Sequence, residues 1–155
     1  MSELLTGKRI LITQADQFMG PMLCEVLRAK GATVIADDSD LSMAGVAEKV
    51  VADSGRIDVL VANLSIPAPS TPAAQVSEEE WQAVFAALVS PLPRLCAAVL
   101  PQMVERRAGK ILLMGSASAL RGMKRASTYS AARGAQLAYI QAVGVEMAEH
   151  NIQIN

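Results

Sequence analysis

ILITQADQFMGPMLCEVLRAKG, residues 10–31, is the stretch that decides the fold. Its first four residues are apolar or β-branched and predict a strand that is buried on both faces. A polar loop follows, and apolar residues then recur at helical spacing until Gly31, which suits the end of a helix. A strand, a loop and a helix in this order form the first unit of a parallel sheet.

The same alternation continues along the rest of the chain. Further strands are expected at 33–36, 58–63, 110–114 and from 152 onward, and helices at 43–54, 78–88, 95–107 and 127–149, with a break around Pro91 and Pro93. This order predicts an α/β fold with a doubly wound, Rossmann-like parallel sheet. Residues 1–155 are expected to form a single Rossmann-like domain. Because the chain stops as a core strand begins, we expect it to be the N-terminal portion of a longer domain.

Composition narrows the class of protein. Of the 155 residues 52% are hydrophobic and 19% are charged, which excludes intrinsic disorder. Lys and Arg number 14 against 15 Asp and Glu, so neither a nucleic acid nor a membrane is an expected partner. The apolar stretches are interrupted before a membrane-spanning length and no secretory signal is visible, so we expect a cytoplasmic protein. Cys24 and Cys96 form no metal motif and are expected to be reduced core residues.

The loop at 13–20 lies where a parallel sheet of this kind usually holds the phosphates of a dinucleotide. Such a cradle needs glycine where it turns and where its backbone approaches the pyrophosphate. Only Gly20 fits this scheme, whereas Gln14 and Phe18 stand at the other two glycine positions, and Asp16 adds negative charge. The loop is either a divergent cradle that still binds weakly or a site that Phe18 has filled. We favour the second interpretation and expect no cofactor.

Two polar groups follow the next strands. Asp37 and Asp38 stand where an acidic residue of a dinucleotide enzyme binds ribose hydroxyl groups, but without a cradle they are more simply loop carboxylates. Asn63 also follows a strand, and we expect its side chain to bond loop backbone.

Ser116, Tyr129 and Arg133 form a second constellation. Ser116 follows a strand, at the carboxyl edge where sites in open α/β sheets lie. Tyr129 and Arg133 are four residues apart on the next helix and therefore share one face. A fixed cation beside a tyrosine favours its phenolate, and a serine hydroxyl can donate to a substrate oxygen. Together these residues can bind a hydroxyl group and remove its proton.

At these residues the chain resembles the short-chain dehydrogenase/reductase superfamily over its whole length. It departs from the oxidoreductases of that superfamily at several positions. Two glycines are missing from the loop, Arg133 replaces the catalytic Lys, Leu88 replaces the helix Asn of the catalytic tetrad, and Ala62-Asn63-Leu64-Ser65 replaces Asn-Asn-Ala-Gly.

These departures resemble one offshoot, the halohydrin (haloalcohol) dehalogenases. Their signatures are Thr-x4-Phe/Tyr-x-Gly and Ser-x12-Tyr-x3-Arg. The chain carries both with the required spacing, at Thr13, Phe18 and Gly20 and at Ser116, Tyr129 and Arg133.

The resemblance implies a cofactor-independent lyase that converts a vicinal haloalcohol to an epoxide and a halide, and opens epoxides with other small anions. Ser116 would hold the substrate oxygen, and Tyr129, assisted by Arg133, would take the proton. Phe18, Ile66, Ser118 and Met123 would line the halide and substrate pocket. The resemblance also implies a homo-oligomer, a dimer or a tetramer.

Two other functions stay open. One is an NAD(P)-dependent short-chain oxidoreductase with a divergent cofactor loop. The other is a catalytically inactive relative that acts as the partner of another subunit, although an inactive copy would not need to keep Ser116, Tyr129 and Arg133.

Overall fold

The computed structural model describes residues 4–155 and contains a parallel sheet of five strands in the order β2-β1-β3-β4-β5. The strands are β1 (Arg9–Thr13), β2 (Thr33–Asp37), β3 (Val59–Ala62), β4 (Gly109–Leu113) and β5 (Ile152–Ile154). The α-helices are α1 (Gly20–Ala29), α2 (Val46–Ser54), α3 (Glu78–Leu88), α4 (Pro91–Arg106) and α5 (Ser127–Met147). The predicted Rossmann-like α/β fold is therefore confirmed.

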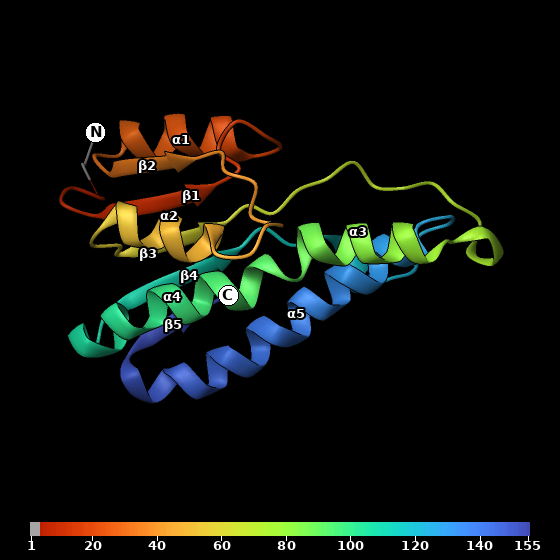
Figure 1. Ribbon diagram of the computed structural model, residues 1–155. Helices are drawn as coiled ribbons and strands as arrows, with labels where there is room; N and C mark the ends of the chain where they lie inside the picture. Colours follow the sequence, from red (N-terminus) through yellow and green to blue (C-terminus); the bar gives the residue numbers. More distant parts are fainter. Residues whose placement is uncertain (1–3) are drawn as a thin grey trace.

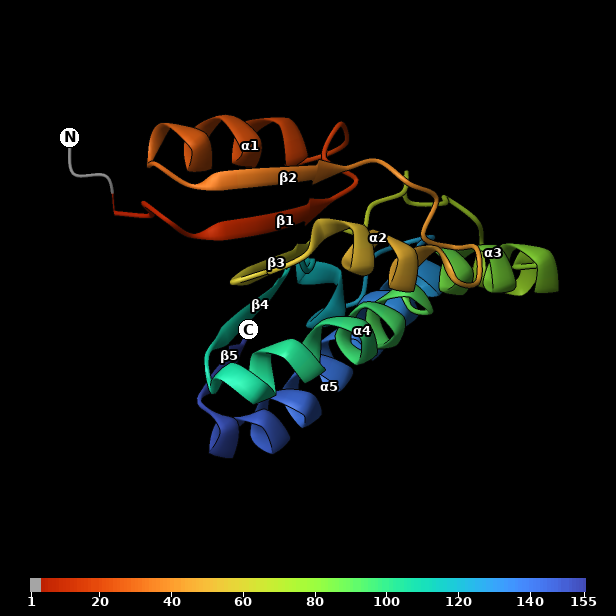
Figure 2. The same ribbon diagram turned by 60° about the vertical axis from the view of Figure 1, so that its left-hand side comes forward.

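Helices cover the sheet on both faces. Helix α1 lies over β1 and β2 on one face, and α2, α4 and α5 lie on the other (Figures 1 and 2). Alternate side chains of β1 point to the two faces, since Ile10 and Ile12 pack with α1, whereas Leu11 belongs to the larger cluster on the opposite face. The near-continuous apolar character of the strands thus follows from burial on both faces.

Two helix starts differ from the expectation. Helix α2 begins at Val46 rather than at 43, after Gly45, whose φ of +81° suits glycine. Helix α4 begins at Pro91 rather than at Leu95. Proline is tolerated in the first turn because the N–H groups there have no intrahelical partner, so Pro91 and Pro93 mark the start of a helix instead of delaying it.

Within residues 4–155, one stretch is long and apolar enough to cross a membrane by length and composition, namely 78–106. It consists of two helices, α3 and α4, and packs its apolar side chains against the sheet. Leu88, Leu92, Leu95, Val99 and Met103 are each at most 1% exposed. These five residues belong to the larger core cluster of the described residues.

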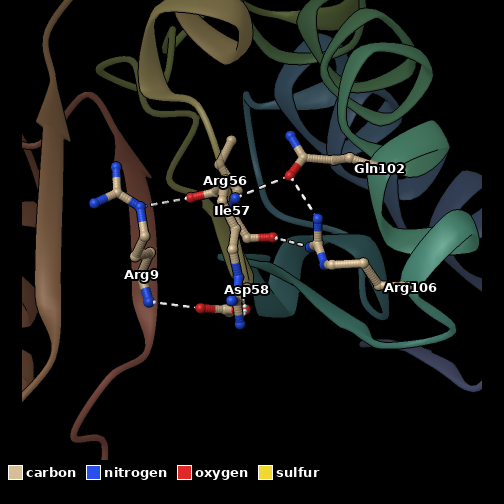
Figure 3. Close-up of polar contacts among 6 residues, drawn as sticks. All are labelled: Arg9, Arg56, Ile57, Asp58, Gln102 and Arg106. Carbon is tan, nitrogen blue, oxygen red and sulfur yellow. Dashed lines mark hydrogen bonds and ion pairs between the residues drawn. The ribbon is translucent and has the colours of Figure 1, made fainter.

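The connection from α2 to β3 is held from both sides (Figure 3). From β1, the Nε of Arg9 donates to the carbonyl of Arg56 at 2.8 Å. From α4, Arg106 donates to the carbonyl of Ile57 at 2.8 Å, and Gln102 accepts from the Ile57 N–H at 3.0 Å. These contacts fix the amino-terminal end of β3 between two elements that are distant in the sequence.

The two cysteines are buried and free, as expected. Cys24 packs with the cluster under α1, and Cys96 belongs to the cluster on the other face of the sheet.

Candidate functional site

A cavity of about 170 Å³ opens beyond the carboxyl ends of β4 and β5. Ser116 and Arg133 line it together with Leu113, Gly115, Ala119, Leu120, Leu137, Ile140 and Asn155. Parallel α/β sheets bind their ligands at this edge. The cavity therefore combines a mostly apolar wall with one hydroxyl group and one guanidinium group.

Arg133 is buried, with 3% of its surface exposed. One guanidinium nitrogen, Nη1, donates to the carbonyl of Met114 at 3.1 Å and to Oε1 of Gln136 at 2.9 Å. Its Nε is buried without a hydrogen-bond partner among the described residues. No Asp or Glu of residues 4–155 forms an ion pair with it. The positive charge of Arg133 is thus held by neutral oxygens and is not cancelled within the described part of the chain.

Tyr129 lies one turn before Arg133 on α5, as predicted from the spacing. The guanidinium carbon of Arg133 lies 5.0 Å from the centre of the Tyr129 ring, which is cation–π contact distance. The contact places a buried cation against the face of the ring, on the same side of α5.

Ser116 receives two hydrogen bonds from Ser118. The N–H and the hydroxyl of Ser118 donate to Oγ of Ser116 at 3.2 Å and 2.9 Å. Both lone pairs of Ser116 are then occupied, so its own hydroxyl proton is free to be donated to a substrate oxygen. Ser118, which is 4% exposed, supports Ser116 and does not itself line the cavity.

The other predicted pocket residues lie outside this cavity. Phe18 and Met123 are 63% and 48% exposed. Ile66 is half-buried and packs against the larger core cluster. The assignment of Phe18, Ile66 and Met123 to a pocket stays a prediction.

The loop between β1 and α1 has the backbone shape of a glycine-rich turn although two of its glycines are absent. Gln14 and Phe18 adopt left-handed conformations, with φ of +45° and +50°. At Gly20 a Cβ would lie 2.5 Å from the carbonyl oxygen of Ala15, so only glycine fits there. The amide of Asn63 donates to the carbonyls of Gln14 and Gln17 at 2.9 Å and 3.0 Å, which confirms its expected role of bonding loop backbone.

This loop and the end of β2 fit the adenosine end of a nicotinamide dinucleotide. One carboxylate oxygen of Asp37, at the end of β2, is buried and has no partner among residues 4–155. A ribose diol would supply the missing donors. Phe18 is 63% exposed, so its ring is not packed into the core beneath the loop. Asp38 is occupied, because it accepts from the N–H of Asp16 at 2.8 Å.

Sequence reasoning missed two residues that the structure connects to the site. Gln136 contacts Arg133 and the carbonyl of Leu88. Glu80 accepts from the hydroxyl groups of Thr71 and Thr128. Helical spacing could have suggested Gln136, which is three residues after Arg133, but no local signal links Glu80 to Thr128, 48 residues away.

Comparison with known proteins supports an oxidoreductase. The family described as short chain dehydrogenase matches residues 37–155. The chain is 31% identical to a 5-keto-D-gluconate 5-reductase of Escherichia coli (strain K12), over 97% of this chain and 70% of that protein. It is 26% identical to the 3-oxoacyl-[acyl-carrier-protein] reductase FabG of the same strain, over 96% of this chain and 71% of that protein.

Two solved structures share the fold closely. A chain described as a dehalogenation enzyme superposes with a TM-score of 0.90 at 26% identity, covering 98% of this chain and 71% of its own. A gluconate 5-dehydrogenase from Burkholderia cenocepacia J2315, in complex with NADP and tartrate, superposes with a TM-score of 0.91. At 22% identity over 99% of this chain and 71% of its own, the second structure supports the fold alone.

The expected halohydrin dehalogenase, a cofactor-independent lyase, is wrong. The curated relatives that align with 96–97% of the chain are reductases, and they support the oxidoreductase alternative instead. The physical reason for the error lies in the chemistry of the triad. A serine that donates to a substrate oxygen and a tyrosine that transfers its proton serve alcohol oxidation as well as epoxide formation. Their spacing therefore does not distinguish the two reactions.

Proposed function

This chain belongs to the short-chain dehydrogenase family, and from that premise we propose that it is a nicotinamide-dependent oxidoreductase that interconverts a carbonyl group and an alcohol of a small substrate. The observation that carries the proposal is the grouping of Ser116, Tyr129 and Arg133, in which Ser116 and Arg133 share one cavity and Arg133 lies against the Tyr129 ring.

The residues of the chain supply the proton and the orientation. Ser116 donates a hydrogen bond to the carbonyl oxygen and so positions the substrate. Tyr129 gives its proton to that oxygen as the alcohol forms. Arg133 stabilises the phenolate that is left, because a cation that cannot lose its proton lies against the ring. In the oxidative direction the same groups remove the proton of the alcohol.

The nicotinamide, when bound, supplies or accepts the hydride. Asp37 would hold the ribose hydroxyl groups of the adenosine, and the loop 14–20 would approach the pyrophosphate. A carboxylate at the end of β2 repels a 2′-phosphate, so we propose NADH rather than NADPH as the preferred cofactor.

The two motifs that resemble those of halohydrin dehalogenases describe, within this proposal, an oxidoreductase with an unusual loop and an arginine in place of lysine. A homo-oligomer and a cytoplasmic location remain part of the proposal. Neither changes the chemistry assigned to the site.

Two measurements test the proposed function. Calorimetric titration with NADH and NADPH should show binding, tighter for NADH. Initial rates of NADH oxidation, measured with 5-keto-D-gluconate and with a 3-oxoacyl thioester, should show carbonyl-dependent turnover with at least one of them. Tyr129→Phe should reduce this turnover by about 100-fold or more, because it removes the transferred proton, while NADH binding persists.

Two results would contradict the proposed function. Failure to bind either dinucleotide would overturn the proposal. So would cofactor-free release of bromide from a vicinal bromoalcohol, since that reaction uses the same residues without hydride transfer.

A further inference from the structure

Gln136 is a polar residue in the centre of the core. It is 0% exposed and uses both ends of its amide. Its Oε1 accepts from Arg133 at 2.9 Å, and its Nε2 donates to the backbone carbonyl of Leu88. A buried amide costs free energy unless both ends are paired, and an apolar side chain would fill the same space without that requirement. The amide therefore has a role that packing alone does not explain.

One end of the amide meets the break between α3 and α4. Helix α3 ends at Leu88, and the carbonyls of a last helical turn lack intrahelical donors. Pro91, at the start of α4, has no N–H to offer. Gln136 supplies the donor for Leu88 and is thereby anchored to a fixed part of the core.

The other end of the amide meets a cation that has no counter-ion. Arg133 is 3% exposed, and within residues 4–155 its hydrogen-bond partners are neutral oxygens, those of Met114 and Gln136. A carboxylate in place of the amide would cancel the charge, whereas the amide oxygen fixes the guanidinium and leaves its charge intact. Tyr129, Arg133 and Gln136 follow one another on α5 at i, i+4 and i+7, so the chain of contacts runs along one face of the helix.

We propose that Gln136 is a positioning residue that holds the Arg133 guanidinium against the Tyr129 ring, so that the buried positive charge acts on the tyrosine that transfers the proton. This inference rests on the proposed function for the role of Tyr129. The inference is drawn from the successive contacts Leu88–Gln136, Gln136–Arg133 and Arg133–Tyr129. Gln136 acts through Arg133 and needs no contact with substrate.

Two substitutions of Gln136 distinguish the position of the Arg133 guanidinium from its charge. Gln136→Leu removes the acceptor for Arg133 and the donor for Leu88 while keeping a similar volume. Gln136→Glu keeps an acceptor for Arg133 but places a negative charge beside it. Gln141→Leu is the matched control, because Gln141 is an exposed glutamine on the same helix. Circular dichroism and thermal unfolding report whether each variant folds, and Gln136→Glu preserves the test if Gln136→Leu does not fold.

The first readout is independent of turnover and of cofactor. The chain has two tyrosines, so Tyr139→Phe leaves Tyr129 as the only source of tyrosinate absorbance. In that background, Gln136→Leu and Gln136→Glu should each move the onset of tyrosinate absorbance to higher pH, because the Arg133 guanidinium is no longer held against the ring with its full charge. Gln141→Leu should leave the titration unchanged.

The second readout is kinetic. With a carbonyl substrate and NADH, the variants at Gln136 should lower kcat about tenfold with little change in KM, since substrate binding does not involve this residue. The pH dependence of kcat should move in the same direction as the tyrosinate titration.

The outcomes distinguish this inference from the proposed function. If Gln136→Glu folds and leaves both the tyrosinate titration and the pH profile unchanged, Gln136 is a structural residue and the inference is wrong, whatever the enzyme does. If the titration moves as expected but no carbonyl reduction is found in the parent protein, the positioning role stands and the proposed function fails.

Discussion

Phe18 is a bulky residue at a backbone conformation that favours glycine. Its φ of +50° places it in the left-handed region, which costs a residue with a Cβ about 1 kcal/mol or more. The ring is 63% exposed and so recovers little of this cost through packing. Strain without compensating burial points to a local role, and the loop lies where a dinucleotide pyrophosphate would approach.

Phe18→Gly should therefore tighten the binding of NADH, by roughly tenfold or about 1.4 kcal/mol, because backbone can approach the phosphates more closely. Calorimetry measures the change. Gln14→Gly is the control, since Gln14 also has a positive φ but its side chain bonds the N–H of Ser65. That variant should gain less affinity. Equal or weaker binding by Phe18→Gly would show that the ring contributes to the site instead of restricting it.

Glu80 on α3 connects the loop after β3 to the start of α5. Its two carboxylate oxygens accept from the hydroxyl groups of Thr128, beside Tyr129, and of Thr71, in the loop after β3. These bonds, the one from Thr128 first, hold the pKa of Glu80 below its usual value. The N–H of Thr71 also donates to the carbonyl of Arg125 at 2.8 Å, so the loop after β3 is joined both to the start of α5 and to the loop before it.

Glu80→Ala should loosen this junction and expose the loop 115–126, which carries Arg121, Lys124 and Arg125, to trypsin. The expected result is faster cleavage within that loop, with the helices intact by circular dichroism. Glu79→Ala, at the neighbouring exposed position, should be cleaved at the parental rate. Mass spectrometry of the fragments locates the cut, and unchanged cleavage of the Glu80 variant would mean that the Arg125 contacts suffice.

The contact between α4 and α5 makes stability depend on alkaline pH. Burial raises the pKa of the Cys96 thiol from 9.0 to about 11, and burial with the neighbouring Cys96 raises the pKa of Tyr139 to about 12. A raised pKa in the folded state means that the unfolded chain releases its proton first as pH increases. Stability is therefore complete below about pH 9 and is lost as pH rises toward 11.

The loss attributable to Cys96 should be about 2 kcal/mol in the free energy of unfolding. Urea denaturation at a series of alkaline pH values measures it. Cys96→Ala should be less stable at neutral pH, because it leaves a small cavity, but should show a shallower decline with pH. A decline as steep as that of the parent would assign the effect to other groups.

At the scale of the whole molecule, the sequence was sufficient to predict the fold and the residues of the site that are close in sequence, but not the residues that reach the site from distant elements. The apolar runs at 10–13 and 58–63 predicted strands buried on both faces, and the sheet has that arrangement. The spacing of Tyr129 and Arg133 predicted their contact, because helix geometry is local. Glu80 was missed because its partner Thr128 lies 48 residues away, and the contact of Gln136 with Leu88 spans the same separation; only the packing of α3 against α5 brings these residues together.

The reaction was mispredicted for a related reason. Motif spacing reports which side chains share an edge of the sheet, and this was sufficient to place Ser116 and Arg133 in one cavity. It does not report which bond breaks, because proton transfer from a tyrosine serves several reactions. The relatives that align along nearly the whole chain are reductases, and they support the oxidoreductase alternative.

Residues at one end of the sheet form the site, whereas residues at the other end stabilise the fold. The site lies at the carboxyl ends of the strands. The contacts of Arg9, Gln102 and Arg106 with the α2–β3 connection, here called the clamp, lie at the amino-terminal end of β3 (Figure 3). Arg106 donates to Gln102 at 3.0 Å and to the carbonyl of Ile57 at 2.8 Å, and Ile57 is 0% exposed. Without Arg106 that buried carbonyl loses a charged donor, which costs about 1–3 kcal/mol.

Arg106→Ala should thus lower the free energy of unfolding by about 1–3 kcal/mol, measured by urea denaturation, while kcat and NADH affinity per folded molecule stay at parental values. Arg28→Ala is the matched control, because Arg28 is an exposed arginine in the last turn of α1, as Arg106 is in the last turn of α4. It should change stability by less than about 0.5 kcal/mol. A fall in kcat of the folded Arg106 variant would show that the clamp and the site are coupled through β3, since that strand begins at the clamp and ends beside Asn63, which binds the loop after β1.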